Sequence, residues 1–238
     1  MAKMTLDELV AQVRGALGPE LRAIALYGSA AAGEHIPKKS DYNVLVVVDS
    51  LASDRLQALS AAVGAWVEGD QPAPLLLTSD EWKGSADIFA MEYADILERH
   101  KILFGAFPAA VKVDPHYLRL QLEHEAMGAL LQLRRGALAA GRDGGELVAL
   151  LDRGHSSVMT LFRAVMRLRG ETPPSDNVQL CESIARAAGT DAAPFVRVVR
   201  HRRGEAKLKS ADAAGVVAAY LVGLQSVVRY LDQFKKRA

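Results

Sequence analysis

The sequence predicts an α/β layer followed by an all-α bundle, and three observations support this fold class. In residues 1–108, short apolar runs typical of strands alternate with segments of helical period. After Pro108 only helical patterns remain, separated by breaks rich in Gly or Pro such as GRDGG and GETPP. Of the 238 residues, 50% are hydrophobic and 24% charged, which is enough apolar material for a core. We therefore divide the chain into domains 1–108 and 109–238.

Each element of the first domain follows from a local pattern. Apolar residues at helical spacing predict a first helix with Thr5 or Asp7 near its start, and Gly18-Pro19 ends it. Continuous apolar runs predict buried strands, with the third beside the second. The predicted helices are Met4–Leu17, Ser53–Glu68 and Asp87–His100, and the predicted strands are Leu21–Tyr27, Asn43–Val48, Pro74–Thr78 and Lys101–Phe104.

The second domain is predicted to be an antiparallel bundle. Its predicted helices are Pro115–Ala140, Gly145–Arg169, Ser175–Ala188, Ala193–His201 and Ala211–Lys236. The last of these carries an apolar face that suits either the bundle core or a homodimer contact, and the pattern does not decide between them.

Composition and charge narrow the function. The formal net charge of +1 gives no global field that would attract nucleic acid or a membrane surface, so we expect neither as a partner. The single cysteine, Cys181, cannot form a disulfide within the chain, and its apolar surroundings predict a buried thiol. The N-terminal residues lack the apolar run of a signal peptide, and no run of 18 apolar residues occurs. We expect the protein in the cytoplasm.

A motif that can hold a phosphate and a metal ion joins the first two predicted strands. Gly28 permits a tight turn and close approach of the backbone to a ligand. The small residues after it predict a short helix over 29–33, whose free N–H groups and N-cap Ser29 would favour an anion. Asp41 and Asn43 lie two residues apart at the start of the second strand and so share a face. Oxygen ligands at these positions suit Mg²⁺.

The stretch LYGSAAAGEHIPKKSDYNVLVVV resembles the signature of polymerase-beta-type nucleotidyltransferases, in which Gly-Ser precedes two acids, one residue apart, at the start of a strand. The segment ADIFAMEYADILERHKILFG resembles the closing segment of this domain in bacterial relatives. The whole architecture resembles aminoglycoside nucleotidyltransferases and the minimal nucleotidyltransferase proteins of prokaryotes. Their fold implies a nucleotidyltransferase-type domain with a small mixed sheet, followed by a helical bundle that binds substrate or partner.

The resemblance implies transfer of a nucleoside monophosphate from a nucleoside triphosphate, with ATP favoured, to a hydroxyl of a small molecule or protein. Mg²⁺ would accompany the triphosphate. Asp41 corresponds to a catalytic, metal-binding acid, and Asn43 to the second metal position, where its carbonyl oxygen remains a ligand. The residues that would hold the nucleotide are Gly28, Ser29, Lys39 and Ser40.

Two departures from the signature concern the metal site. Superfamily members gather three acids, whereas here Asn43 occupies the second position and the third strand offers only Leu75-Leu76-Leu77. Losing two of three anions should weaken metal binding severely, because one pair of unit charges 4 Å apart near a surface interacts by about 4 kcal/mol. The bundle offers Glu123 as a candidate base. The other candidate acids are Glu125, Glu92 and Asp95, and each of the four is also explained as a solvated helix acid or an ion-pair partner.

Three functions therefore remain open from the sequence. The first is an active nucleotidyltransferase with a degenerate metal site. The second is a catalytically impaired protein that binds nucleotide as a sensor or regulator, and the third is an antitoxin-like interaction module. The absent acids favour the second and third, while the retained Gly-Ser and Asp41 favour a surviving ligand site.

Overall fold

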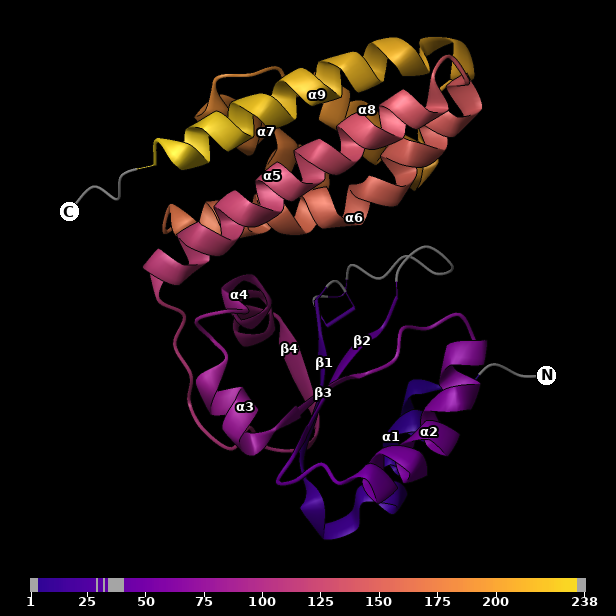
Figure 1. Cartoon of the computed structure of the whole chain (residues 1–238), viewed down its shortest axis with the longest axis vertical. Helices are drawn as coiled ribbons and strands as arrows, with labels where there is room; N and C mark the ends of the chain where they lie inside the picture. Colours follow the sequence, from indigo (N-terminus) through magenta and orange to yellow (C-terminus); the bar gives the residue numbers. More distant parts are fainter. Residues whose placement is uncertain (1–3, 29, 32, 34–40, 235–238) are drawn as a thin grey trace. The chain divides into compact units, whose positions relative to one another are not determined.

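The computed structural model describes residues 4–28, 30–31, 33 and 41–234 of the chain. The chain divides into two compact units, residues 1–114 and 115–238 (Figure 1). The first unit contains α1 (Leu6–Leu17), β1 (Leu21–Tyr27), β2 (Asn43–Val48), α2 (Ser53–Glu68), β3 (Leu75–Thr78), α3 (Ser79–Gly84), α4 (Ala90–Glu98) and β4 (His100–Gly105). The second contains α5 (Pro115–Ala140), α6 (Gly144–Leu168), α7 (Asn177–Ala188), α8 (Ala193–Arg203) and α9 (Ser210–Asp232).

The sheet is small and mixed. Its strand order is β3-β2-β1-β4, with β1 antiparallel to both β2 and β4, and β3 parallel to β2. The third strand lies beside the second, as the sequence predicts. The fold class is confirmed: a mixed sheet with helices precedes a helical part.

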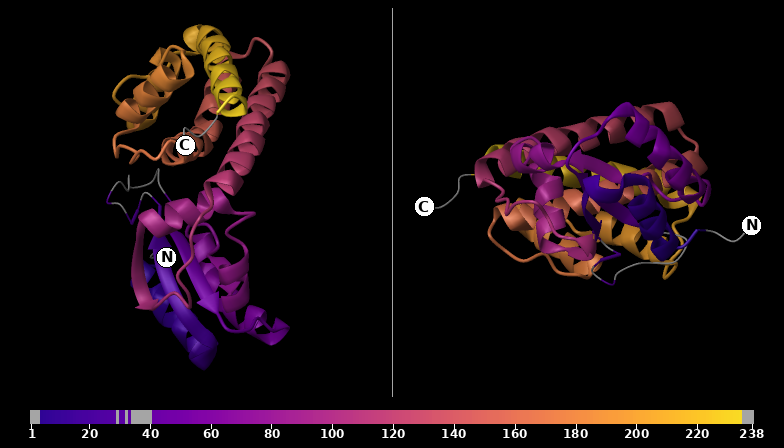
Figure 2. Two further views of the ribbon diagram at one scale, coloured as in Figure 1. Left: turned by 90° about the vertical axis from the view of Figure 1, so that its left-hand side faces the viewer. Right: turned by 90° about the horizontal axis from the view of Figure 1, so that it is seen from below.

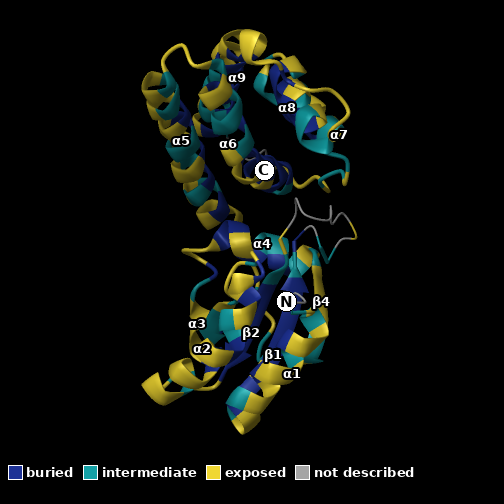
Figure 3. Cartoon of the chain, turned by 90° about the vertical axis from the view of Figure 1, so that its right-hand side faces the viewer, coloured by how far each residue is buried: buried dark blue, intermediate teal, exposed yellow. Residues whose placement is uncertain are grey.

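Helices cover both faces of this sheet. On β2, Val44, Val46 and Val48 pack with residues of α1 and α2, whereas Leu45 and Val47 pack with residues of α3 and α4. This alternation is the two-residue period of a strand buried on both sides. Figure 3 shows the resulting buried ribbons of β1 and β2 between partly exposed helices.

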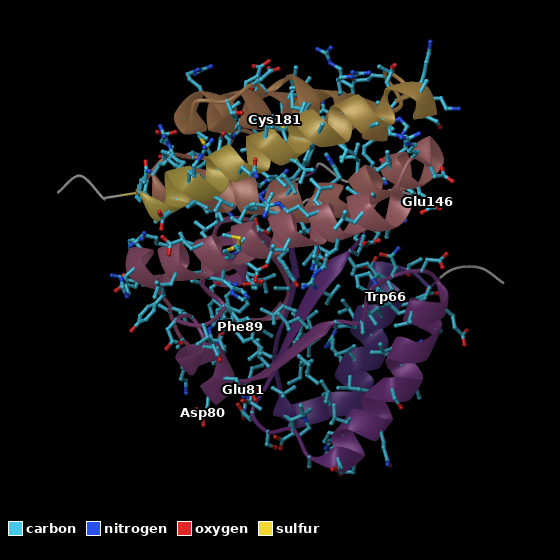
Figure 4. The ribbon with its side chains drawn as sticks, turned by 45° about the horizontal axis from the view of Figure 1, so that its top comes forward. Trp66, Asp80, Glu81, Phe89, Glu146 and Cys181 are labelled. Atoms are coloured by element: carbon cyan, nitrogen blue, oxygen red, sulfur yellow. The ribbon has the colours of Figure 1, made fainter. Side chains whose placement is uncertain are left out.

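Side-chain caps fix where two helices of the first unit begin. Thr5 caps α1 and exchanges hydrogen bonds with Glu8, and Thr78 does the same for α3 with Glu81. The sequence analysis missed α3, which is only six residues long, although Thr78-x-x-Glu81 is a capping-box pattern. The predicted helix Asp87–His100 was too long, since α4 begins at Ala90. Figure 4 labels Glu81 beside the exposed Asp80 on α3.

In the second unit α6 and α9 form the centre, since both contact α5, α7 and α8 as well as each other (Figure 2). Cys181 of α7 is fully buried among these helices (Figure 4), and burial raises the pKa of its thiol to about 12. The predicted buried thiol is therefore confirmed. Among the described helices, α9 has the length and apolar composition of a membrane span, and its packing against the four other helices explains that composition.

A buried histidine lies inside the second unit. His155 of α6 is 8% exposed, and its Nδ1 has no hydrogen-bond partner among the described residues. Burial, with smaller effects from Arg202, Arg163 and Arg203, lowers the pKa of His155 to about 4. The imidazole is therefore neutral in the folded protein well below the pH at which a histidine in an unfolded chain takes up a proton.

This histidine predicts a pH-dependent stability. Because the folded pKa is lowered, the unfolded chain binds the extra proton first as the pH falls. Stability should thus decrease from about pH 6.5 towards pH 4, by up to about 3 kcal/mol from this group. Urea unfolding at pH 7 and pH 5 should show a smaller difference for His155→Gln than for the wild type. His124→Gln, at an exposed position of α5, is the matched control and should keep the wild-type difference.

A second prediction concerns Gly105, at the end of β4. Its φ is +64°, and a Cβ there would lie 1.9 Å from the backbone oxygen of Arg22. Gly105→Ala should therefore lower the free energy of unfolding by about 2 kcal/mol or more, measured by urea denaturation. Gly15→Ala is the control, because no described atom outside the adjacent helix backbone and chain neighbours lies within 4 Å of its Cβ position in α1. It should be neutral or stabilising by up to about 1 kcal/mol, and an equal loss in both variants would contradict the steric argument.

Candidate functional site

The candidate site lies at the end of the sheet where β1 stops and β2 and β4 begin. Tyr27, the last residue of β1, pairs with Asn43 on one side and His100 on the other. Gly28 follows with a φ of +74°, and its N–H donates to the backbone oxygen of Arg99 at 3.0 Å. The turn after β1 is thus held by the chain between α4 and β4.

Two polar side chains converge on Gly28. A Cβ at this position would lie 3.2 Å from Nδ2 of Asn43 and 3.5 Å from Oδ2 of Asp95. Both atoms therefore lie near the same point, the Cβ position of residue 28, and so near each other. Glycine is favoured here for two reasons: its positive φ and the closeness of Nδ2 of Asn43, whereas Oδ2 of Asp95 is at an ordinary contact distance.

The face on which Asn43 lies follows from the packing of β2. Tyr42 packs with the core on the α1 and α2 side, its ring 6.1 Å from that of Trp66, which Figure 4 labels. Its backbone N–H donates to Oε1 of Gln71 at 2.9 Å, which holds the chain entering β2. Alternation puts Asn43 on the opposite face, towards α4, and predicts the same side for the exposed Asp41.

Two carboxylates of α4 influence the same end of the sheet. The pKa of Tyr27 is raised, chiefly by burial and then by the negative charges of Glu92 and Asp95. These acids lie three residues apart and so share a helix face. The hydroxyl of Tyr27, the amide of Asn43 and the α4 carboxylates therefore belong to one polar cluster on this face.

The neighbouring strand adds no charge to this cluster. Leu75 of β3 pairs with Leu45, so it lies on the face that also carries Asn43. Among the described residues, no group of three or more His, Cys, Asp or Glu side chains is placed to hold a metal ion. The oxygen ligands offered by Asp41, Asn43 and Asp95 suit a cation that brings most of its ligands with it.

The helix predicted after Gly28 needs correction, and three of the predicted nucleotide-binding residues are not described by the structure. The described residues Gly28, Ala30, Ala31 and Gly33 form turns, whereas the sequence analysis predicted a short helix over 29–33. The N–H groups of these described residues therefore belong to turns. The nucleotide-binding candidates Ser29, Lys39 and Ser40 lie outside the described residues.

The candidate base Glu123 is engaged within its own helix. Its half-buried carboxylate accepts a hydrogen bond from Arg119, one turn earlier in α5, and forms an ion pair with it. An ion pair of this kind is the alternative to a catalytic role of Glu123 that the sequence also allows. Asp95 was one of several candidate acids, and the distance of 3.5 Å from its Oδ2 to the Cβ position of residue 28 now separates it from the rest.

Comparison with known proteins identifies the fold. The structure of spectinomycin adenyltransferase AAD(9) from Enterococcus faecialis with ATP and spectinomycin superposes with a TM-score of 0.62, at 12% sequence identity, over 96% of this chain and 98% of that one. The chain has the nucleotidyltransferase fold. The resemblance to aminoglycoside nucleotidyltransferases, seen in the sequence, is thereby confirmed.

Curated relatives of this nucleotidyltransferase-fold chain also match by sequence. Multifunctional CCA proteins of Burkholderia orbicola (strain MC0-3) and Burkholderia cenocepacia (strain HI2424) are 29% identical over 191 residues, which is 76% of this chain. The chain spans 40% of the length of these relatives. No protein-family model matches the chain.

The crowding at Gly28 predicts the effect of adding a methyl group. Gly28→Ala should lower the free energy of unfolding by about 1–2 kcal/mol through its positive φ, and further by displacing the amide of Asn43. Gly33→Ala is the matched control, since its φ of +76° imposes the same strain while no atom of the other described residues lies within 4 Å of its Cβ position. Urea denaturation should show the larger loss for Gly28→Ala. Equal losses would mean that the side chain of Asn43 yields without cost.

Proposed function

We propose that the protein transfers a nucleoside monophosphate from a nucleoside triphosphate, with ATP favoured, to a hydroxyl group of a small molecule or protein. The observation that carries this proposal is the turn at Gly28, flanked by Asn43 and Asp95, in a fold shared with an adenyltransferase solved with ATP. The proposed compartment is the cytoplasm, which suits a chain whose only cysteine is a buried thiol.

The binding of the triphosphate is assigned to the turn between β1 and β2. Gly28 lets the backbone approach a phosphate closely, and N–H groups of a turn favour anions. Ser29, Lys39 and Ser40 are proposed to complete this contact through a hydroxyl and an ammonium group. Lysine acts here as a point charge beside phosphate oxygens.

The residues present fit Mg²⁺ only if it is shared with the triphosphate. Mg²⁺ is commonly held by one or two carboxylates together with substrate phosphates. Asp41 would supply a carboxylate and Asn43 a carbonyl oxygen, while Leu75 supplies no ligand from β3. When bound, the cation neutralises charge on the phosphates.

The proposed reaction is an in-line displacement. The acceptor oxygen forms a bond to the α-phosphorus as the bond from that phosphorus to the bridging oxygen of the β-phosphate breaks. Pyrophosphate leaves with the electron pair, and the hydroxyl proton passes to a base. Glu123 remains the proposal for that base, and its ion pair with Arg119 would have to open first.

A second candidate function is a nucleotide-binding regulator without transfer. It is favoured by the neutral side chains of Asn43 and Leu75, at positions where catalysis would gain from carboxylates. Both functions require nucleotide binding, so transfer to an acceptor separates them. A protein-interaction module with no nucleotide site is the third possibility that the test below addresses.

Replacing Asp41 tests the first candidate. Asp41→Asn should remove most of the Mg²⁺-dependent part of ATP affinity in calorimetry, because the variant loses the one carboxylate of the signature. Transfer of labelled nucleotide, read by mass spectrometry, should fall by about a hundredfold or more. The control Asp54→Asn changes an exposed acid of α2 and should behave like the wild type. ATP binding without transfer to any acceptor would favour the regulator, and no binding at millimolar ATP would leave the interaction module.

A further inference from the structure

The site has a neutral side chain, that of Asn43, where the signature has an acid, and it has an additional carboxylate, that of Asp95, near this side chain. The resemblance implies an acid where Asn43 stands, and the structure brings Oδ2 of Asp95 to the same side of Gly28 as Nδ2 of Asn43. We propose that Asp95 supplies the carboxylate that position 43 lacks, so that the second charge of the site comes from helix α4 and not from strand β2. This inference rests on the proposed nucleotide-binding function and deepens it.

The place of Asp95 is fixed by packing on either side of it. Tyr93 and Ile96 are 2% and 0% exposed, and both belong to the core between α4 and the sheet. The hydroxyl of Tyr93 also donates to the backbone oxygen of Trp82 at 2.9 Å. Four residues after Asp95, the backbone oxygen of Arg99 accepts the N–H of Gly28. The carboxylate therefore sits on a helix turn that is anchored to the sheet.

The charge at position 43 and the charge at position 95 are linked by electrostatic repulsion. Carboxylates at both positions, without a cation, would repel each other across Gly28, and such repulsion disfavours the charged forms. An amide at position 43 removes that repulsion while keeping one oxygen ligand and gaining a donor. A neutral residue 43 and an acidic residue 95 thus place one carboxylate, and not two, next to Gly28.

Asp95 is preferred over Glu92 because of where each is placed. Oδ2 of Asp95 lies 3.5 Å from the Cβ position of residue 28, the residue proposed to approach the triphosphate. Glu92 is exposed, and its negative charge helps to raise the pKa of Tyr27. The proposed role of Asp95 is to hold the cation that accompanies the nucleotide, and it takes no part in bond breaking.

The test measures how a non-hydrolysable ATP analogue binds the full-length chain, by calorimetry, once with Mg²⁺ and once with EDTA. If Asp95 holds the cation, Asp95→Asn should weaken binding about tenfold or more with Mg²⁺. With EDTA the same variant should bind as well as the wild type or better, because a negative charge near the triphosphate has been removed. Asn43→Asp combined with Asp95→Asn returns the charge to the strand and should recover most of the lost Mg²⁺-dependent affinity.

The control is Asp80→Asn, the same chemical change on α3, where the carboxyl side chain is 96% exposed. It should bind like the wild type in both conditions. Binding by Asp95→Asn that is unchanged in both conditions, or equally weakened in both, would overturn the role of Asp95 and leave the proposed function standing. A wild type that binds the analogue in neither condition would overturn both. Circular dichroism checks that each variant is folded.

Discussion

The candidate site depends on the antiparallel pairing of β1 with β2, whose register is continuous from Ala23, opposite Val47, to Tyr27, opposite Asn43. Tyr27 faces Asn43 across this pair, so the turn after β1 and the start of β2 meet at one end of the sheet. The same register sends Val44 and Val46 to one core and Leu45 to the other. A slip by one residue would exchange these faces, so the burial of the valines also fixes the side on which Asn43 lies.

Packing and electrostatics are therefore linked at this end of the molecule. In the signature that the sequence resembles, the charges come from neighbouring positions on strands, whose placement the backbone hydrogen bonds guarantee. In the site that we propose, one carboxylate comes from α4, whose position depends on the side chains of Trp82, Tyr93 and Ile96 that pack against the sheet. A change in that core would then move this proposed functional charge without replacing any residue of the motif.

Much of the fold could be predicted from local sequence patterns. The bounds of β1, β2, α2 and α5 match the predictions residue for residue, because apolar periodicity and Gly or Pro breaks mark them clearly. Helix α3 was missed because six residues are too few to show a period, although its capping box was visible. The helix expected over 29–33 rested on small residues and an N-cap alone, and its described residues form turns.

The site itself was predictable only where its residues are close in sequence. Gly28, Asp41 and Asn43 belong to one short motif, whereas Asp95 reaches the site through the pairing of β1 with β4. No local pattern distinguished it from Glu92, Glu123 or Glu125.

Each unit has apolar packing of its own. The buried clusters of the first unit draw on residues between Met4 and Val113, and the helices α5 to α9 of the second unit pack on one another. Amino-acid replacements can thus accumulate in the bundle while the sheet that supports the motif keeps its own support. Evolution could in this way redirect one half of such a chain to new molecules while preserving the chemistry of the other.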